Sequence, residues 1–170
     1  MPDPLLKTTF LVDAYNDPVI IKINGRASYL NCASFSDFID QMIQQGKLNF
    51  ALDFTDCTGM DSTFLGILAS TALRVHKHEM KGEVILCHLS VKNLKLIRNV
   101  GLHRVVEIDS EGFPMDFNKR GQDLISSSKD EGKDAKIILQ AHESLVQIDD
   151  RNLARFQDVI SFLKNQVGPS

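Results

Sequence analysis

The sequence predicts an α/β domain with a mixed sheet, in the element order ββαβαβαβ, followed by a C-terminal α-helical hairpin. A chain of 170 residues with 43% hydrophobic and 24% charged side chains has the composition of a folded domain with an appendage. Between residues 8 and 108, short apolar runs alternate with stretches of helical periodicity, as parallel strands and their crossover helices do. After a wholly polar segment at 126–134, apolar residues recur every three or four positions, which indicates packed helices.

The first half of the domain contains three strands and one helix. The β-branched and aromatic runs at 8–14 and 19–24 are separated by Asn16-Asp17-Pro18, which favours a strand hairpin. Ser34, with Asp37 three residues later, is the expected helix start, and Gly46 the expected stop. The nearly continuous apolar run at 49–54 predicts a strand covered on both faces.

The second half repeats the strand and helix alternation. Residues 61–78 carry a wide apolar stripe and predict a largely buried helix, and 83–87 follow as a buried strand. A helix capped by Ser90, a strand at 105–108 and a short helix within 113–125 complete the domain. We therefore expect a domain at 1–125, a polar linker at 126–134 and a helical hairpin at 135–167, broken at Asp149-Asp150.

Charge and cysteine usage exclude several classes of protein. The net charge of -3, without a Lys/Arg block, excludes the electrostatic footprint of a nucleic-acid binder. No run approaches the ~20 apolar residues of a membrane span, and the amino terminus lacks a signal-peptide pattern. Cys32, Cys57 and Cys87 are widely spaced without a CxxC pair, as in a protein with reduced, buried thiols. We expect a cytoplasmic protein whose partner is another protein.

Catalytic and metal-binding patterns are weak. His76 and His78 are about 200° apart around their helix, and Cys87-His88 lacks a second pair of ligands. The chain contains neither a Gly-rich phosphate loop nor a Gly-x-Ser-x-Gly elbow. We therefore expect a protein that is not an enzyme and needs no cofactor or metal. A thiol or serine hydrolase centred on Cys57 or Ser62 is the alternative from another class.

The most informative segment is Asp61-Ser62-Thr63, where a short loop enters the helix at 61–78. Backbone N–H groups and the helix dipole favour negative charge at this position, so a phosphate on Ser62 would be partly stabilised. Ser62 is therefore a candidate switch residue. The structural alternative is that Asp61, Ser62 and Thr63 only cap the helix.

A set of short motifs adds a family resemblance. The chain resembles the STAS domain of bacterial anti-sigma factor antagonists over roughly residues 8–125. The resemblance rests on Leu52-x-Phe54, Met60-Asp61-Ser62-Thr63-x-Leu65-Gly66, Gly82-Glu-Val-Ile-Leu-Cys87, and Leu94 followed by Val100-Gly101-Leu102 and the strand at 105–108.

The resemblance implies a protein-binding switch in which Ser62 is phosphorylated. The partner would be an anti-sigma factor that is itself a serine kinase; the unphosphorylated form would capture it and free the sigma factor, and a serine phosphatase would reset the switch. A phosphoserine adds about -1.5 to -2 charges, and beside Asp61, near Asp53 and Asp56, it would repel the partner.

The alternative is a STAS scaffold or lipid-transport accessory module without phosphorylation. The implied partner surface comprises Asp61, Ser62, Thr63, Ser28 and Asp56.

Three features depart from the family pattern. Phe64 stands where the family usually has glycine, and its ring either packs inward or alters access by the kinase. Ser28, in Gly25-Arg26-Ala27-Ser28, replaces an acidic residue that flanks the phosphorylation site. The C-terminal hairpin lies outside the family core, and we expect it to dock on its own domain or on a second copy, which would form a homodimer.

Overall fold

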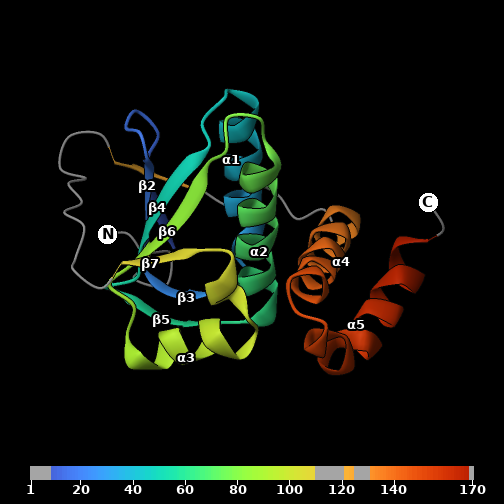
Figure 1. The fold of residues 1–170 in the computed structure, drawn as a ribbon. Helices are drawn as coiled ribbons and strands as arrows, with labels where there is room; N and C mark the ends of the chain where they lie inside the picture. Colours follow the sequence, from blue (N-terminus) through green and yellow to red (C-terminus); the bar gives the residue numbers. More distant parts are fainter. Residues whose placement is uncertain (1–8, 110–120, 125–130, 169–170) are drawn as a thin grey trace, which may run out of the picture.

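In the computed structural model, residues 9–109, 121–124 and 131–168 are described, and they form the predicted α/β architecture (Figure 1). Within these described ranges the main sheet has six strands, in the order β7-β6-β4-β2-β1-β8. A small second sheet pairs β3 (Gly25–Ala27) with β5 (Cys57–Met60). The main-sheet strands are β1 (Phe10–Asp13), β2 (Val19–Ile23), β4 (Asn49–Asp53), β6 (Glu83–Cys87), β7 (Glu107–Asp109) and β8 (Gln122–Asp123).

Strand directions match the predicted mixed sheet. β1 and β2 form an antiparallel hairpin with Val12 opposite Ile21, while β2, β4, β6 and β7 are mutually parallel. The central parallel strands β4 and β6 carry mostly buried residues with apolar side chains in their middle, as expected when helices cover them. β8 returns to the other edge and pairs antiparallel with β1.

In the described part of the domain, the α-helices are α1 (Cys32–Gln44), α2 (Ser62–Lys77) and α3 (Val91–Asn99). α2 and α3 begin where the sequence predicts, capped by Asp61 and Ser90. α1 begins two residues before the predicted cap Ser34, because Asn31 occupies the N-cap position. The Asn31 side chain accepts the Ser28 N–H, and the Ser34 hydroxyl donates back to the Asn31 carbonyl oxygen.

Several boundaries differ from the sequence expectation. The last parallel strand begins at Glu107 because Leu102–Arg104 form a short 3₁₀ helix, and the N–H groups of Val105 and Val106 donate to the Leu102 carbonyl oxygen. Of the segment predicted to contain a helix, 113–120 and 125 lie outside the described residues, and Gln122–Asp123 form β8. The helix α4 begins at Glu131, inside the predicted linker at 126–134.

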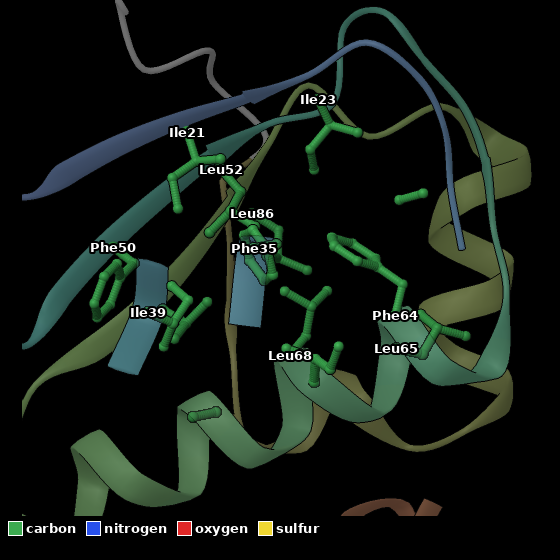
Figure 2. Packing of buried hydrophobic residues seen from close by; sticks show 14 of the residues in the cluster. Ile21, Ile23, Phe35, Ile39, Phe50, Leu52, Phe64, Leu65, Leu68 and Leu86 are labelled. Atoms are coloured by element: carbon green, nitrogen blue, oxygen red, sulfur yellow. The ribbon is translucent and has the colours of Figure 1, made fainter. Parts of the chain in front are cut away.

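An aromatic cluster fills the space between the sheet and helices α1 and α2. Phe64 is fully buried, and its ring centroid lies 5.1 Å from that of Phe35 and 5.9 Å from that of Phe10. Figure 2 shows Phe64 pointing from α2 into the space between the helices and the strands, close to Phe35. The Phe64 ring therefore packs inward, which is the first of the two alternatives that the sequence left open.

The C-terminal hairpin consists of α4 (Glu131–Ile148) and α5 (Arg151–Val167), with the break at the predicted Asp149-Asp150. α4 packs along α2 on the side away from the sheet, and α5 lies beyond α4 (Figure 1). Ala141 and Leu145 of α4 are buried and belong to the same apolar cluster as the sheet. The hairpin therefore docks on its own domain and adds a further helical layer to α1 and α2.

Candidate functional site at the start of helix α2

The start of α2 is fixed by the side chain of Asp61. Its Oδ1 accepts the Phe64 N–H at 3.0 Å, and its Oδ2 accepts the Tyr29 N–H at 2.8 Å. The Asp61 backbone N–H donates to the Ala27 carbonyl oxygen at 3.1 Å. These bonds connect the helix start to the loop after β3, and the first of them is a standard N-cap.

Ser62 is the first residue of α2 and bonds to the C-terminal hairpin. Its Oγ lies 2.8 Å from Nε2 of His142, a residue of α4 that is only 3% exposed. The Nδ1 atom of His142 lies 2.8 Å from the Ile138 carbonyl oxygen. Because a carbonyl oxygen only accepts, Nδ1 donates in this contact, and in the tautomer with its hydrogen on Nδ1 the Nε2 atom accepts the hydroxyl proton of Ser62.

The other hydroxyl groups near this helix start differ in accessibility. Thr63 is buried at 4% exposure, whereas Thr58 in β5 is exposed. Ser28 is also buried, and its Oγ accepts the Leu30 N–H at 3.2 Å. Ser62, which is half-buried, is therefore the more accessible of the two hydroxyls in the first turn of α2.

The structure brings together four of the five residues of the implied partner surface. Asp61, Ser62 and Thr63 are consecutive, and Ser28 belongs to the turn that Asp61 holds through Tyr29. Asp56 lies at the opposite end of β5, where its carboxylate forms a 3.0 Å ion pair with Lys22. The expected anionic cluster around Ser62 is therefore centred on Asp61, and β5 separates it from Asp56.

Two further contacts attach the hairpin to the domain, and neither was expected from the sequence. An ideal Cβ atom at Gly66 would overlap the carbonyl group of Ala141 and lie 2.7 Å from its Cα, so the α4 backbone packs directly on α2. At the end of α3, Nδ2 of the fully buried Asn152 donates to the carbonyl oxygen of Val100 at 2.9 Å, and it also donates to the carbonyl oxygen of Leu145 within the hairpin at 2.8 Å.

His142 is the residue of this site that the sequence reasoning missed. The signal was its spacing, since it lies four residues after Ile138 and three before Leu145, on the apolar side of α4. A histidine within such a stripe indicates a buried imidazole with specific hydrogen-bond partners.

The cysteines, the remaining candidate residues, are packed in the interior of the protein. All three cysteines are free and buried, and burial raises the pKa of Cys57 above its ordinary value. Among the described residues, no three His, Cys, Asp or Glu side chains are grouped so that they could hold a metal ion.

A cavity of about 20 Å³ lies between α1, α2 and α4. It is lined by Ile39, Ile67 and Ala141 among others and has room for about one water molecule.

In the described part of the chain, no helix combines the length and the apolar character that crossing a bilayer requires.

Comparison with known structures shows the same fold. A candidate anti-sigma factor antagonist from Thermotoga maritima superposes with a TM-score of 0.53 at 21% identity, covering 60% of this chain and 87% of that chain. An anti-sigma factor antagonist from Mycobacterium paratuberculosis gives a TM-score of 0.51 at 17% identity, with coverages of 65% and 91%. SpoIIAA, an anti-sigma factor antagonist in its unphosphorylated form, gives 0.50 at 18% identity, with coverages of 59% and 87%.

The comparison of sequences identifies the family. No curated protein matches the chain. The family model of the STAS domain matches residues 9–112, which comprise more than half of the sequence and include every motif on which the resemblance rests. The chain therefore belongs to the STAS domain family.

Proposed function

We propose that this protein is a protein-binding switch of the anti-sigma factor antagonist type, controlled by reversible phosphorylation of Ser62. The partner is an anti-sigma factor with serine kinase activity, and a serine phosphatase reverses the modification. The observation that carries the proposal is the position of Ser62, the first residue of α2, directly after the N-cap Asp61. The sequence Asp61-Ser62-Thr63 places this serine at the position that the family phosphorylates.

Charge determines the direction of the switch. The Asp61 carboxylate already accepts two backbone N–H groups at this surface. A phosphate on Ser62 adds about -1.5 to -2 charges next to that carboxylate. Repulsion and the cost of removing water from two adjacent anions then weaken an interface that the neutral hydroxyl allows. The switch needs no refolding of the domain.

The contact between Ser62 and His142 favours a second candidate, a serine hydrolase. A hydroxyl 2.8 Å from an imidazole nitrogen, with the other ring nitrogen held by a carbonyl oxygen, is the arrangement of a nucleophile and its base. An acyl substrate also needs open space beside the hydroxyl. The cavity on the α2–α4 contact holds about one water molecule and is not lined by Ser62 or His142, so this candidate ranks second.

Mass spectrometry of the full-length protein from its host cells tests the proposal. We expect a species heavier by about 80 Da that phosphatase removes and that fragmentation assigns to Ser62. The Ser62→Ala variant should lose this species, while Thr58→Ala, which removes an exposed hydroxyl, should retain it.

Other outcomes would identify the alternatives. Phosphate on Thr63 would contradict the assignment, and an unmodified protein would favour the STAS scaffold or lipid-transport accessory module. A Ser62 adduct with a fluorophosphonate probe, without phosphate, would favour the hydrolase.

A further inference from the structure

We propose that the C-terminal hairpin, residues 131–168, is an intramolecular ligand of the switch surface, and that the unmodified hydroxyl of Ser62 is required for its docking. The switch surface is defined as residues 61–66, from the N-cap to the second turn of α2. The inference rests on the proposed function in one respect: it takes this surface as the one that the partner and the kinase must reach.

The first contact places the switch residue itself inside the interface. The Ser62 hydroxyl bonds to Nε2 of His142, whose ring is buried and contacts Phe156 edge-on at a centroid distance of 5.2 Å. A phosphoryl group on this hydroxyl would have to lie between two atoms already 2.8 Å apart. The buried and tightly packed contact has no room for that group, so phosphorylation and docking of the hairpin exclude each other.

The second contact shows that α4 covers the switch surface closely. Any side chain at Gly66 would overlap the backbone of Ala141, which is itself only 2% exposed. A protein that binds α2 at this surface would need the volume that α4 fills. The partner and the hairpin therefore compete for residues 61–66.

The third contact fixes the hairpin in one register. Asn152 bonds to the carbonyl oxygen of Val100, and Arg155 donates to the carbonyl oxygen of Asn99 at 2.6 Å. Gly101, which has a φ of +78°, leaves room for Asp149, whose Oδ2 would lie 2.7 Å from a Cβ placed there. The bond from Asn152 is buried, and a buried hydrogen bond belongs to a specific interface rather than to loose apolar contact.

These contacts give a closed and an open state. In the closed state α4 shields Ser62 from the kinase and residues 61–66 from the partner. The kinase and the partner therefore both act on the open state. Once Ser62 is phosphorylated, the hairpin stays undocked even after the kinase has left. The domain thus contains an internal competitor for its own partner.

Hydrogen exchange of the full-length chain tests the inference without any partner. Gly66→Ala should release α4 by steric overlap, although alanine is the better helix former within α2. Ser62→Glu should release it because the longer side chain does not fit where the Ser62 Oγ and His142 Nε2 atoms are already 2.8 Å apart. We expect the amides of 134–148 to exchange at least about tenfold faster in both variants, while β4 and β6 keep their protection.

A matched control adds the same charge elsewhere. Thr58→Glu places a carboxylate on an exposed residue of β5, next to Lys92, and should leave 134–148 as protected as in the unmodified protein. Unchanged protection of 134–148 in both Gly66→Ala and Ser62→Glu would overturn the inference. Protection that depends on protein concentration would also overturn it, because a second copy would then supply the hairpin.

The test separates this inference from the proposed function. Release of α4 in Gly66→Ala and Ser62→Glu, with no phosphate on Ser62 in the host, would uphold the internal ligand and refute the switch. Phosphate on Ser62 in a protein whose α4 stays protected would uphold the switch and refute the internal ligand.

Discussion

Asp61 holds Tyr29 by accepting its backbone N–H at 2.8 Å, which ties the turn after β3 to the start of α2. The same carboxylate caps the helix through Phe64, so one side chain positions two segments that are 32 residues apart. Ser62 follows this N-cap residue directly as the first residue of α2.

Replacing Asp61 should therefore destabilise the domain. We expect Asp61→Ala to lower the free energy of unfolding by about 1 to 2 kcal/mol, measured by urea denaturation. Asp61→Asn, whose amide oxygen can still cap the helix, should lose less. A loss in Asp61→Asn as large as in Asp61→Ala would show that the cap contributes little.

Phe64 should be a major determinant of stability. Its fully buried ring contacts Phe10 and Phe35, so Phe64→Ala should cost about 3 to 5 kcal/mol through lost burial and the remaining cavity. Phe162→Ala, at a ring that is 62% exposed, should change stability by no more than about 0.5 kcal/mol. Equal effects in urea denaturation would contradict the inward placement of Phe64.

Acid should weaken the connection between α4 and α5. Hydrogen bonds from Arg151 lower the pKa of the Asp149 carboxyl from 3.8 to about 2. The depressed pKa means that Asp149 contributes its full stability above about pH 4, and that the contribution is lost as pH falls towards 2. The unfolding free energies of the unmodified protein and Asp149→Asn should therefore differ most above pH 4 and converge towards pH 2. A difference independent of pH would contradict this assignment.

The buried cysteines should be unreactive in the folded protein. Burial raises the pKa of both Cys32 and Cys87 to about 12, with nearby aspartates adding to the effect. Because the thiolate is the reactive form, iodoacetamide at pH 8 should modify the folded chain slowly and all three cysteines rapidly in urea. Rapid alkylation of Cys57 in the folded state would instead favour the thiol hydrolase alternative.

The same pKa shifts predict weaker stability in alkali. The raised pKa of Cys32 and Cys87 means that the folded thiols keep protons which the unfolded thiols release above about pH 9. The free energy of unfolding should fall as pH rises from 9 towards 12, and it should fall less steeply with pH in Cys87→Ala. An equally steep fall in Cys87→Ala would show that groups other than this thiol cause the loss of stability.

Local patterns predicted the elements that build the core. The apolar runs at 49–54 and 83–87 and the wide stripe of 61–78 each mark an element covered by others, and all three formed as expected. The small sheet was missed because Cys57-Thr58-Gly59-Met60 has no β-branched run, and β5 forms by pairing with β3. Tertiary pairing overrode local propensity there.

The candidate site was predictable only in part. Asp61 and Ser62 are adjacent in the sequence, so a motif could identify them together. His142 lies 80 residues from Ser62 and reaches it only because α4 packs on α2. Helical periodicity indicates that α4 has an apolar face, but it does not indicate which helix that face covers.

The point at which the hairpin is attached has a consequence for affinity. Leu124, directly after β8, donates its N–H to the Phe10 carbonyl oxygen, and only six residues separate it from the first residue of α4. A short connection of this kind holds a ligand at an effective concentration on the order of 1 mM. A partner that binds only the open form would then show an apparent Kd equal to its intrinsic Kd divided by the open fraction, about a hundredfold weaker if about 1% of molecules are open. Changes in the length of this connection would therefore retune the affinity for the partner without altering a residue that the partner contacts.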